Sequence, residues 1–208
     1  MRDGNKDGRG MARWLVGIAV AVACIGAASV VSASPPSSEG FTAAVRVLLG
    51  RSIAGGRVLV IGAGGAARAA VHALASHRAE RIVIVNRTQE RARALAHRFA
   101  HAGTRIEVVE SAGEIGADAF DLAVNATSLG LHPGDPLPLD PGTGPRIDAA
   151  LDLVYGRTGE TRWVRAMAAA GVPTMDGTEM LLQQGAAAFR RWWSLDPPLE
   201  AMRAALQG

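Results

Sequence analysis

The chain has 208 residues, of which 49% are hydrophobic and 20% charged, and this balance is typical of a globular protein with a core of its own. Its formal net charge is only +3, and because no basic stripe with interleaved aromatic residues stands out, nucleic-acid binding is not expected. The sequence holds a single cysteine, Cys24, so it can form neither a disulfide between two of its own residues nor a cysteine-based metal site.

Residues 1–40 are predicted to lie outside the folded domain. Residues 1–13 are polar and charged, which predicts disorder, and residues 34–40 are rich in proline and serine, as linkers are. Residues 14–33 form an uncharged stretch with three open interpretations. It resembles a secretory signal, with residues 11–33 as the exported leader; it could be a weak membrane span; or it is a remnant of an upstream domain.

The central stretch of the chain predicts a strand, a glycine-rich turn, a helix and a second strand. A short helix is expected over residues 41–50, and a buried strand over Arg57–Ile61. Gly62-Ala63-Gly64-Gly65-Ala66-Ala67 follows, then about ten residues of helical composition, then an apolar strand at Arg81–Val85. This is a βαβ unit whose first turn fits the dinucleotide-binding pattern, with alanine at its third small position.

Each small residue of this turn has its own physical task. Gly62 permits the tight turn, Gly64 lets the backbone approach a pyrophosphate, and Ala67 lets the helix pack closely on the strand. The pyrophosphate then lies at the helix N-terminus, where free N–H groups and the helix dipole favour an anion. A purely structural glycine turn is the alternative.

The end of the second strand distinguishes between the two nicotinamide dinucleotides. An NAD site usually has an acidic residue there, which binds the ribose 2′-hydroxyl. This chain has Asn86, then Arg87, Thr88 and Arg91. Guanidinium groups bind a phosphate in a fork geometry, so the pattern favours NADP, although solvated arginines at a helix start would look the same.

The rest of the chain continues to alternate between strands and helices. This predicts an α/β fold, a Rossmann-like doubly wound and mostly parallel sheet with flanking helices, over residues 41–208. Strands are expected at 106–109, 120–124, 149–154 and 174–175; helices at 89–101, 160–170, 178–193 and 199–206; a short helix or turn at 111–117; and a loop at 131–146.

Further candidate site residues follow the later strands. Asn125, Thr127 and Ser128 suit a loop along the nicotinamide half of a cofactor, or an ordinary Asx or ST turn. Asp152 and Tyr155 end the next strand, as a buried turn carboxylate and a possible substrate ligand or packing residue. On the long helix, Met180 and Gln184 share one face. The five histidines show no metal spacing and are interpreted as surface residues, so no metal site is predicted.

These motifs resemble those of the shikimate dehydrogenase family. The matching segments are VLVIGAGGAARA (58–69), IVNRTQERA (84–92), DLAVNATSLG (121–130), LDLVYG (151–156) and DGTEMLLQQGAAAFRRW (176–192). The resemblance implies that NADP contacts Gly62, Ala63, Gly64, Gly65, Ala66, Asn86, Arg87, Thr88, Arg91, Thr127, Ser128, Leu153 and Gly177, with Met180 near the nicotinamide. It also implies that Tyr155 and Gln184 contact the substrate, shikimate or 3-dehydroshikimate.

The sequence also departs from the family pattern. The family's N-terminal substrate domain carries a catalytic lysine and a partner aspartate, whereas the only lysine here is Lys6, and Ser37 aligns with the aspartate. No catalytic residue is therefore assigned. We expect a cytoplasmic, NADPH-dependent shikimate dehydrogenase-like oxidoreductase that is truncated and weakly active or inactive alone. The alternative is a non-catalytic NADP-binding module, or a subunit that receives its substrate domain from another chain.

Overall fold

The computed structural model describes residues 36–100, 103–132, 134–155 and 160–207. The predictions for residues 1–35, including the uncharged stretch at 14–33, lie outside the described residues, as does His101. No helix in the described part of the chain is both long enough and apolar enough to span a membrane.

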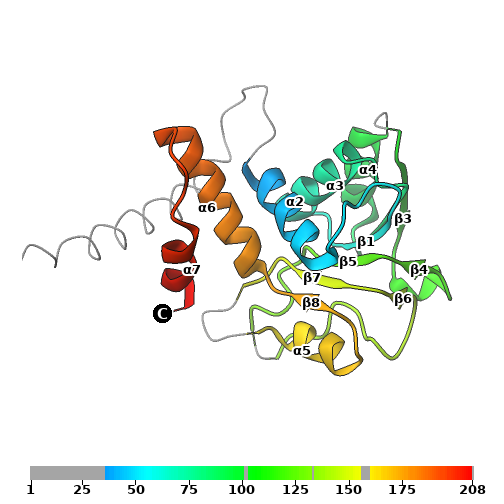
Figure 1. Ribbon diagram of the computed structural model, residues 1–208. Coiled ribbons are helices and arrows are strands. Elements are labelled where there is room, and N and C mark those ends of the chain that lie inside the picture. Colours follow the sequence, from blue (N-terminus) through cyan, green and yellow to red (C-terminus); the bar gives the residue numbers. More distant parts are fainter. Residues whose placement is uncertain (1–35, 101–102, 133, 156–159, 208) are drawn as a thin grey trace, which may run out of the picture.

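A six-stranded sheet forms the centre of the molecule (Figure 1). Its order is β3-β2-β1-β5-β7-β8 and every pair is parallel, which confirms the predicted doubly wound α/β fold. The strands are β1 (Arg57–Ile61), β2 (Arg81–Val85), β3 (Arg105–Val109), β5 (Leu122–Asn125), β7 (Ala150–Asp152) and β8 (Thr174–Met175).

Both faces of the sheet are covered, as a parallel sheet requires. Along β1, Val58 and Val60 pack into one apolar cluster, and Leu59 and Ile61 into the other. Three helices cover the first face: α2 (Pro36–Leu49), α3 (Gly65–Ser76) and α4 (Gln89–Phe99); α5 (Arg162–Ala169) lies on the opposite face (Figure 1). Trp163 of α5 is 1% exposed and donates from Nε1 to the Leu139 carbonyl over 2.9 Å.

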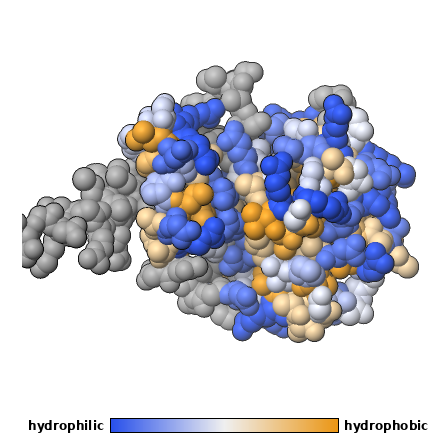
Figure 2. Space-filling view, viewed as in Figure 1, coloured by the Kyte–Doolittle hydropathy of each residue, from blue (hydrophilic) through white to orange (hydrophobic). Residues whose placement is uncertain are grey.

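The C-terminal helices lie at one end of this layered body. Helix α6 (Gly177–Trp193) packs along α2, and α7 (Leu199–Gln207) packs on α6, where Arg203 forms an ion pair with Glu179. Figure 2 shows that hydrophobic surface interrupts a mostly hydrophilic face over α2, whose Val47 is exposed.

The predicted linker at residues 34–40 is wrong in its second part, because α2 begins at Pro36. Proline is favoured at a first helical position, and Glu39 lies in the first turn, where the helix dipole favours a carboxylate. The contact between α2 and α6 could not be predicted from the local sequence. A Cβ on Gly40 would lie 2.6 Å from Gln184 Cγ and 2.9 Å from the Met180 carbonyl oxygen, so α2 and α6 approach closely at this glycine.

The strand predicted at 120–124 is divided in two. Asp121 separates β4 (Ala119–Phe120) from β5, and its Oδ2 accepts the Arg57 N–H over 2.8 Å. Strand β4 pairs with β6 (Arg146–Ile147) in a separate two-stranded sheet, so the predicted loop at 131–146 ends one residue too late. The strand predicted at 149–154 shortens to Ala150–Asp152, and a short helix, η1 (Ala112–Ile115), stands within the predicted 111–117.

Among the four histidines that the structure describes, His72 departs from the surface interpretation. His72 is half-buried, its ring nitrogen lies 3.2 Å from Ser38 Oγ, and its ring packs against Phe99 at a centroid distance of 5.6 Å. His72 therefore joins α2 and α4 to α3.

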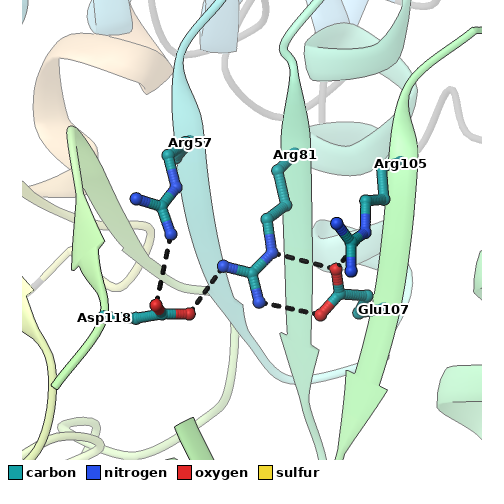
Figure 3. Close-up of polar contacts among 5 residues, drawn as sticks. All are labelled: Arg57, Arg81, Arg105, Glu107 and Asp118. Carbon is teal, nitrogen blue, oxygen red and sulfur yellow. Dashed lines mark hydrogen bonds and ion pairs between the residues drawn. The ribbon is translucent and has the colours of Figure 1, made fainter. Parts of the chain in front are cut away.

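The strands begin at a cluster of charged side chains, shown in Figure 3. Arg57, Arg81 and Arg105 stand in register at the start of β1, β2 and β3. Arg81 donates to both oxygens of Glu107, over 2.9 and 2.8 Å, and to Asp118 over 2.6 Å. These bonds from Arg81 hold the pKa of the Glu107 and Asp118 carboxyls below their usual values. The cluster fixes the end of the sheet opposite the glycine turn.

Replacing Arg81 with glutamine is expected to lower the thermal midpoint of unfolding by a few degrees at neutral pH. Both carboxyls have depressed folded-state pKa values, so their contribution is present above an unfolded pKa of about 4 and is lost as the pH falls through the folded values. The difference from the parent chain should therefore shrink in acid. Thermal unfolding between pH 3 and 7 measures this.

Arg146→Gln is the matched control, because its ion pair with Asp148 is largely exposed and should contribute little. An equal loss in both variants, or an Arg81→Gln loss that does not change with pH, would contradict the assignment.

Candidate cofactor site

The glycine turn after β1 needs glycine at Gly62 for two reasons. Its φ is +111°, a backbone conformation that residues with a side chain rarely adopt. A Cβ there would also lie 2.8 Å from the Ala126 carbonyl oxygen. The Gly62 N–H donates to the Val85 carbonyl over 2.8 Å, so the turn is fixed between the ends of β2 and β5.

The N-terminus of α3 opens to solvent directly after this turn. Gly64 is the N-cap residue, and no side chain in the described part of the chain caps the helix there. Gly64, Gly65 and Ala66 are exposed, and a Cβ added at Gly64 or Gly65 would meet no atom within 4 Å. Ala67 is fully buried, as its predicted packing role requires. The free N–H groups of this first turn can therefore receive an anion.

Two exposed arginines stand beyond the end of β2. Arg87 and Arg91 are both exposed, and neither takes part in an ion pair among the described residues. Asn86 and Thr88 shape the connection into α4, since Asn86 Nδ2 donates to the Thr88 carbonyl over 2.8 Å and Thr88 is the N-cap. Because β1 and β2 pair in parallel, this connection leaves the same edge of the sheet as the glycine turn.

The segment after β5 is ordered by its own polar side chains. Asn125 is fully buried, and its Oδ1 accepts from the Thr127 N–H over 3.1 Å and the Thr127 hydroxyl over 2.7 Å. The Thr127 Oγ1 accepts in turn from the Leu129 N–H over 3.0 Å. The Asx and ST turn interpretation is therefore confirmed. Ser128 is exposed at the tip of the turn.

A buried carboxylate connects this segment to its neighbours. Asp152 Oδ1 accepts from Asn125 Nδ2 over 2.8 Å and from the Val154 N–H over 2.9 Å, and Oδ2 accepts from the Thr161 hydroxyl over 2.6 Å. Burial raises the pKa of Asp152, and the three donors oppose that rise. Thr161 was missed by sequence reasoning. Its signal is a threonine before a helical run, and it is indeed the N-cap of α5.

The start of α6 closes on the end of β7. Gly177 is buried, and a Cβ there would lie 2.7 Å from the Leu153 carbonyl oxygen, while the Gly177 N–H donates to the Val154 carbonyl over 3.2 Å. Asp176 caps the helix by accepting from the Thr178 N–H over 3.0 Å. Leu153 and Met180 are half-buried and pack against the main apolar cluster.

The two residues predicted to contact a substrate come from the segment after β7 and from helix α6. Tyr155 is 45% exposed just after β7, and Gln184 is half-buried in α6, against Gly40 of α2. A small hollow among the described residues lies elsewhere, between α2 and α3, and is lined in part by Phe41, Val45 and Leu74. It holds none of the predicted site residues.

The predicted cofactor loops share one edge of the sheet. The ends of β1, β2, β5 and β7 carry them, and the chain order reverses between β1 and β5, where doubly wound sheets bind ligands. The described residues contain no group of three or more histidine, cysteine, aspartate or glutamate side chains placed to hold a metal ion.

Two family models match the chain. Residues 44–130 match the model described as shikimate/quinate 5-dehydrogenase, and residues 177–207 match the C-terminal domain of shikimate 5′-dehydrogenase. The shikimate dehydrogenase (NADP(+)) of Methanothrix thermoacetophila is 40% identical over 162 residues, which are 76% of this chain and 56% of that protein. The protein of the same name from Halobacterium salinarum is 44% identical over 156 residues, 75% of this chain and 56% of that protein.

A solved structure of shikimate 5-dehydrogenase from Thermus thermophilus, in complex with NADP(H) and shikimate, superimposes with a TM-score of 0.68 and 39% identity. The match covers 83% of this chain and 61% of that one. The chain thus spans a little over half the length of the curated relatives it matches. Two family models, relatives at 40–44% identity and a shared fold agree with the motifs after β1, β2, β5 and β7, and the chain therefore belongs to the shikimate dehydrogenase family.

Proposed function

We propose that this chain binds NADP(H) at the edge of the sheet described above, as the cofactor-binding part of a shikimate dehydrogenase-type oxidoreductase. The reaction is the NADPH-dependent reduction of 3-dehydroshikimate to shikimate. The observation that carries the proposal is the open N-terminus of α3 beside the exposed Arg87 and Arg91. The relatives named above, which are NADP(+) enzymes, support it.

The residues at this edge of the sheet suit the phosphates and the nicotinamide half of this cofactor. The N–H groups of Gly64, Gly65 and Ala66 would bind the pyrophosphate, and Arg87 and Arg91, with Asn86 and Thr88, the 2′-phosphate. The nicotinamide half would lie along Thr127, Ser128, Leu153, Gly177 and Met180. The bound cofactor supplies the hydride, and the protein binds and orients it.

The substrate side of the proposal rests on Tyr155 and Gln184. A phenol and an amide can both hydrogen-bond a ring hydroxyl, and Gln184 lies where α6 meets α2. Oxidising or forming such a hydroxyl also needs a positioned proton donor or acceptor, which typically contributes about 10²–10⁴-fold to the rate. The described residues contain no lysine, and Lys6 is the only one in the sequence. A cofactor-binding module without turnover of its own is therefore the second candidate.

Calorimetric titration with NADPH tests the proposal. We expect binding in the micromolar range, weakened at least about 100-fold in the double variant Arg87→Ala/Arg91→Ala, since each charge-assisted contact contributes roughly 1.5–3 kcal/mol. A second titration with shikimate present should show coupling between the two ligands if Tyr155 and Gln184 form a substrate site.

The matched control is Arg93→Ala/Arg98→Ala, which removes the same charge from exposed positions of α4. It should bind NADPH as the parent chain does. Equal weakening in both double variants would show a general charge effect and contradict the assigned phosphate site. Cofactor binding that is indifferent to shikimate would favour the second candidate.

A further inference from the structure

Asp152 places a buried carboxyl group at the end of β7. Its side chain is fully buried and accepts three hydrogen bonds, two of them at Oδ1. The Asn125 amide and the Val154 backbone N–H can only donate, so Oδ1 must be an unprotonated oxygen. Oδ2 accepts from the Thr161 hydroxyl, whose oxygen in turn accepts from the Val164 N–H, so all three bonds are of the kind that an ionised carboxylate accepts. The carboxylate is thus held by neutral dipoles.

No cation neutralises this carboxylate within the part of the chain that the structure describes. Asp152 belongs to no ion pair there, and the parallel register of β7 and β8, which pairs Leu151 with Met175, places the carboxyl-bearing Asp176 next to Asp152. Asp176 caps α6 directly before Gly177, which contacts Leu153. Two acidic side chains therefore stand together where β7 meets α6.

The loops that Asp152 holds are those assigned above to the nicotinamide half of the cofactor. Asn125 orders the turn that contains Thr127, and Val154, whose N–H Asp152 binds, accepts the Gly177 N–H. The nicotinamide ring carries a positive charge in NADP⁺ and none in NADPH. A negative charge in a poorly solvated site stabilises a nearby cation and leaves a neutral ring unaffected.

We propose that Asp152, with Asp176 beside it, biases the site toward the oxidised cofactor by stabilising the positively charged nicotinamide ring. The inference rests on the proposed function, and it adds a role in redox-state preference that is separate from holding the loops. A purely structural role would change the affinity for both forms of the cofactor equally, whereas the charge changes their ratio.

The variant Asp152→Asn separates the two roles, because it is isosteric and neutral. The asparagine oxygen keeps the two bonds at Oδ1, and its Nδ2 can donate to the Thr161 hydroxyl. We expect the ratio of the dissociation constants of NADP⁺ and NADPH to move about three- to tenfold in favour of NADPH, because only the cationic ring loses the attraction of the removed charge. Calorimetry with each cofactor form measures both constants.

Asp196→Asn is the control, with the same change of charge beyond the far end of α6, and it should leave the ratio unchanged. Asp176→Asn keeps a good N-cap residue and should move the ratio in the same direction by less, which gives a second test if Asp152→Asn does not fold. Both cofactors binding with an unchanged ratio in these two variants would overturn the inference. Binding of neither form by the parent chain would overturn the proposed function, and this inference with it.

Discussion

The variant Gly62→Ala is expected to lower the thermal midpoint of unfolding by about 5–15 °C, which corresponds to roughly 2–4 kcal/mol for a domain of this size. Two costs combine. At φ +111° an alanine lies outside the left-handed region that side chains tolerate best, and its Cβ would lie 2.8 Å from the Ala126 carbonyl oxygen. That carbonyl belongs to the backbone directly after β5, so it cannot turn aside as a flexible side chain can. Thermal unfolding followed by circular dichroism measures the loss.

Gly65→Ala is the matched control for this stability measurement. Gly65 is the first residue of α3, and an added Cβ meets no atom within 4 Å. Alanine is also the better helix former, so stability should be unchanged or rise by up to about 1 kcal/mol. Equal midpoints for Gly62→Ala and Gly65→Ala would show that the turn after β1 relaxes around the substitution, and would contradict the account of Gly62.

The sequence predicted the centre of the fold most accurately, for a physical reason. Strands β1 and β2 have their predicted bounds because each consists of an arginine and four apolar residues that are buried on both faces, and each is limited by turn residues. The glycine turn after β1 was equally predictable. Only glycine meets the demand at Gly62, so its residue type alone carried the information.

The errors occur where long-range contacts override local composition. Pro36 to Gly40 has the composition of a linker, yet packing against α6 makes it the first turns of a helix. Strand β4 exists because it pairs with β6, 27 residues farther along the chain, and Asp121 interrupts the run because it accepts the Arg57 N–H. No local sequence pattern predicts a strand partner at that separation along the chain.

The candidate site divides in the same way. The alternative of an Asx or ST turn at Asn125 and Thr127 was predictable, because such side chains bond to their own backbone two residues on. The hydrogen bonds that Asp152 accepts from Thr161 and Asn125 were not predictable, since Thr161 is nine residues away and Asn125 comes from another strand. The contacts of the site residues with cofactor and substrate stay predictions, and the titrations proposed above test them.

The variant Gly64→Ala is expected to have the opposite profile to Gly62→Ala: an unchanged fold and a loss of cofactor binding. Gly64 has φ −88° and ψ −164°, an extended conformation open to any residue, and a Cβ there would meet no protein atom within 4 Å. Stability should stay within about 0.5 kcal/mol of the parent chain, as for surface substitutions in general. The affinity for NADPH should fall at least about tenfold, because the pyrophosphate has to approach the backbone where the methyl group would stand.

Thermal unfolding and calorimetric titration of Gly62→Ala, Gly64→Ala and Gly134→Ala decide whether the two roles are separate. Gly134 is exposed in the loop after β5, and it serves as the control for both measurements. Unchanged NADPH affinity in Gly64→Ala would mean that the pyrophosphate does not cross the start of α3. The open helix N-terminus would then be a property of the turn alone, and the arginines after β2 would have to bind their phosphate without it. A loss of affinity at constant stability, in contrast, would assign Gly64 to the ligand and Gly62 to the fold, although the two glycines stand only two residues apart.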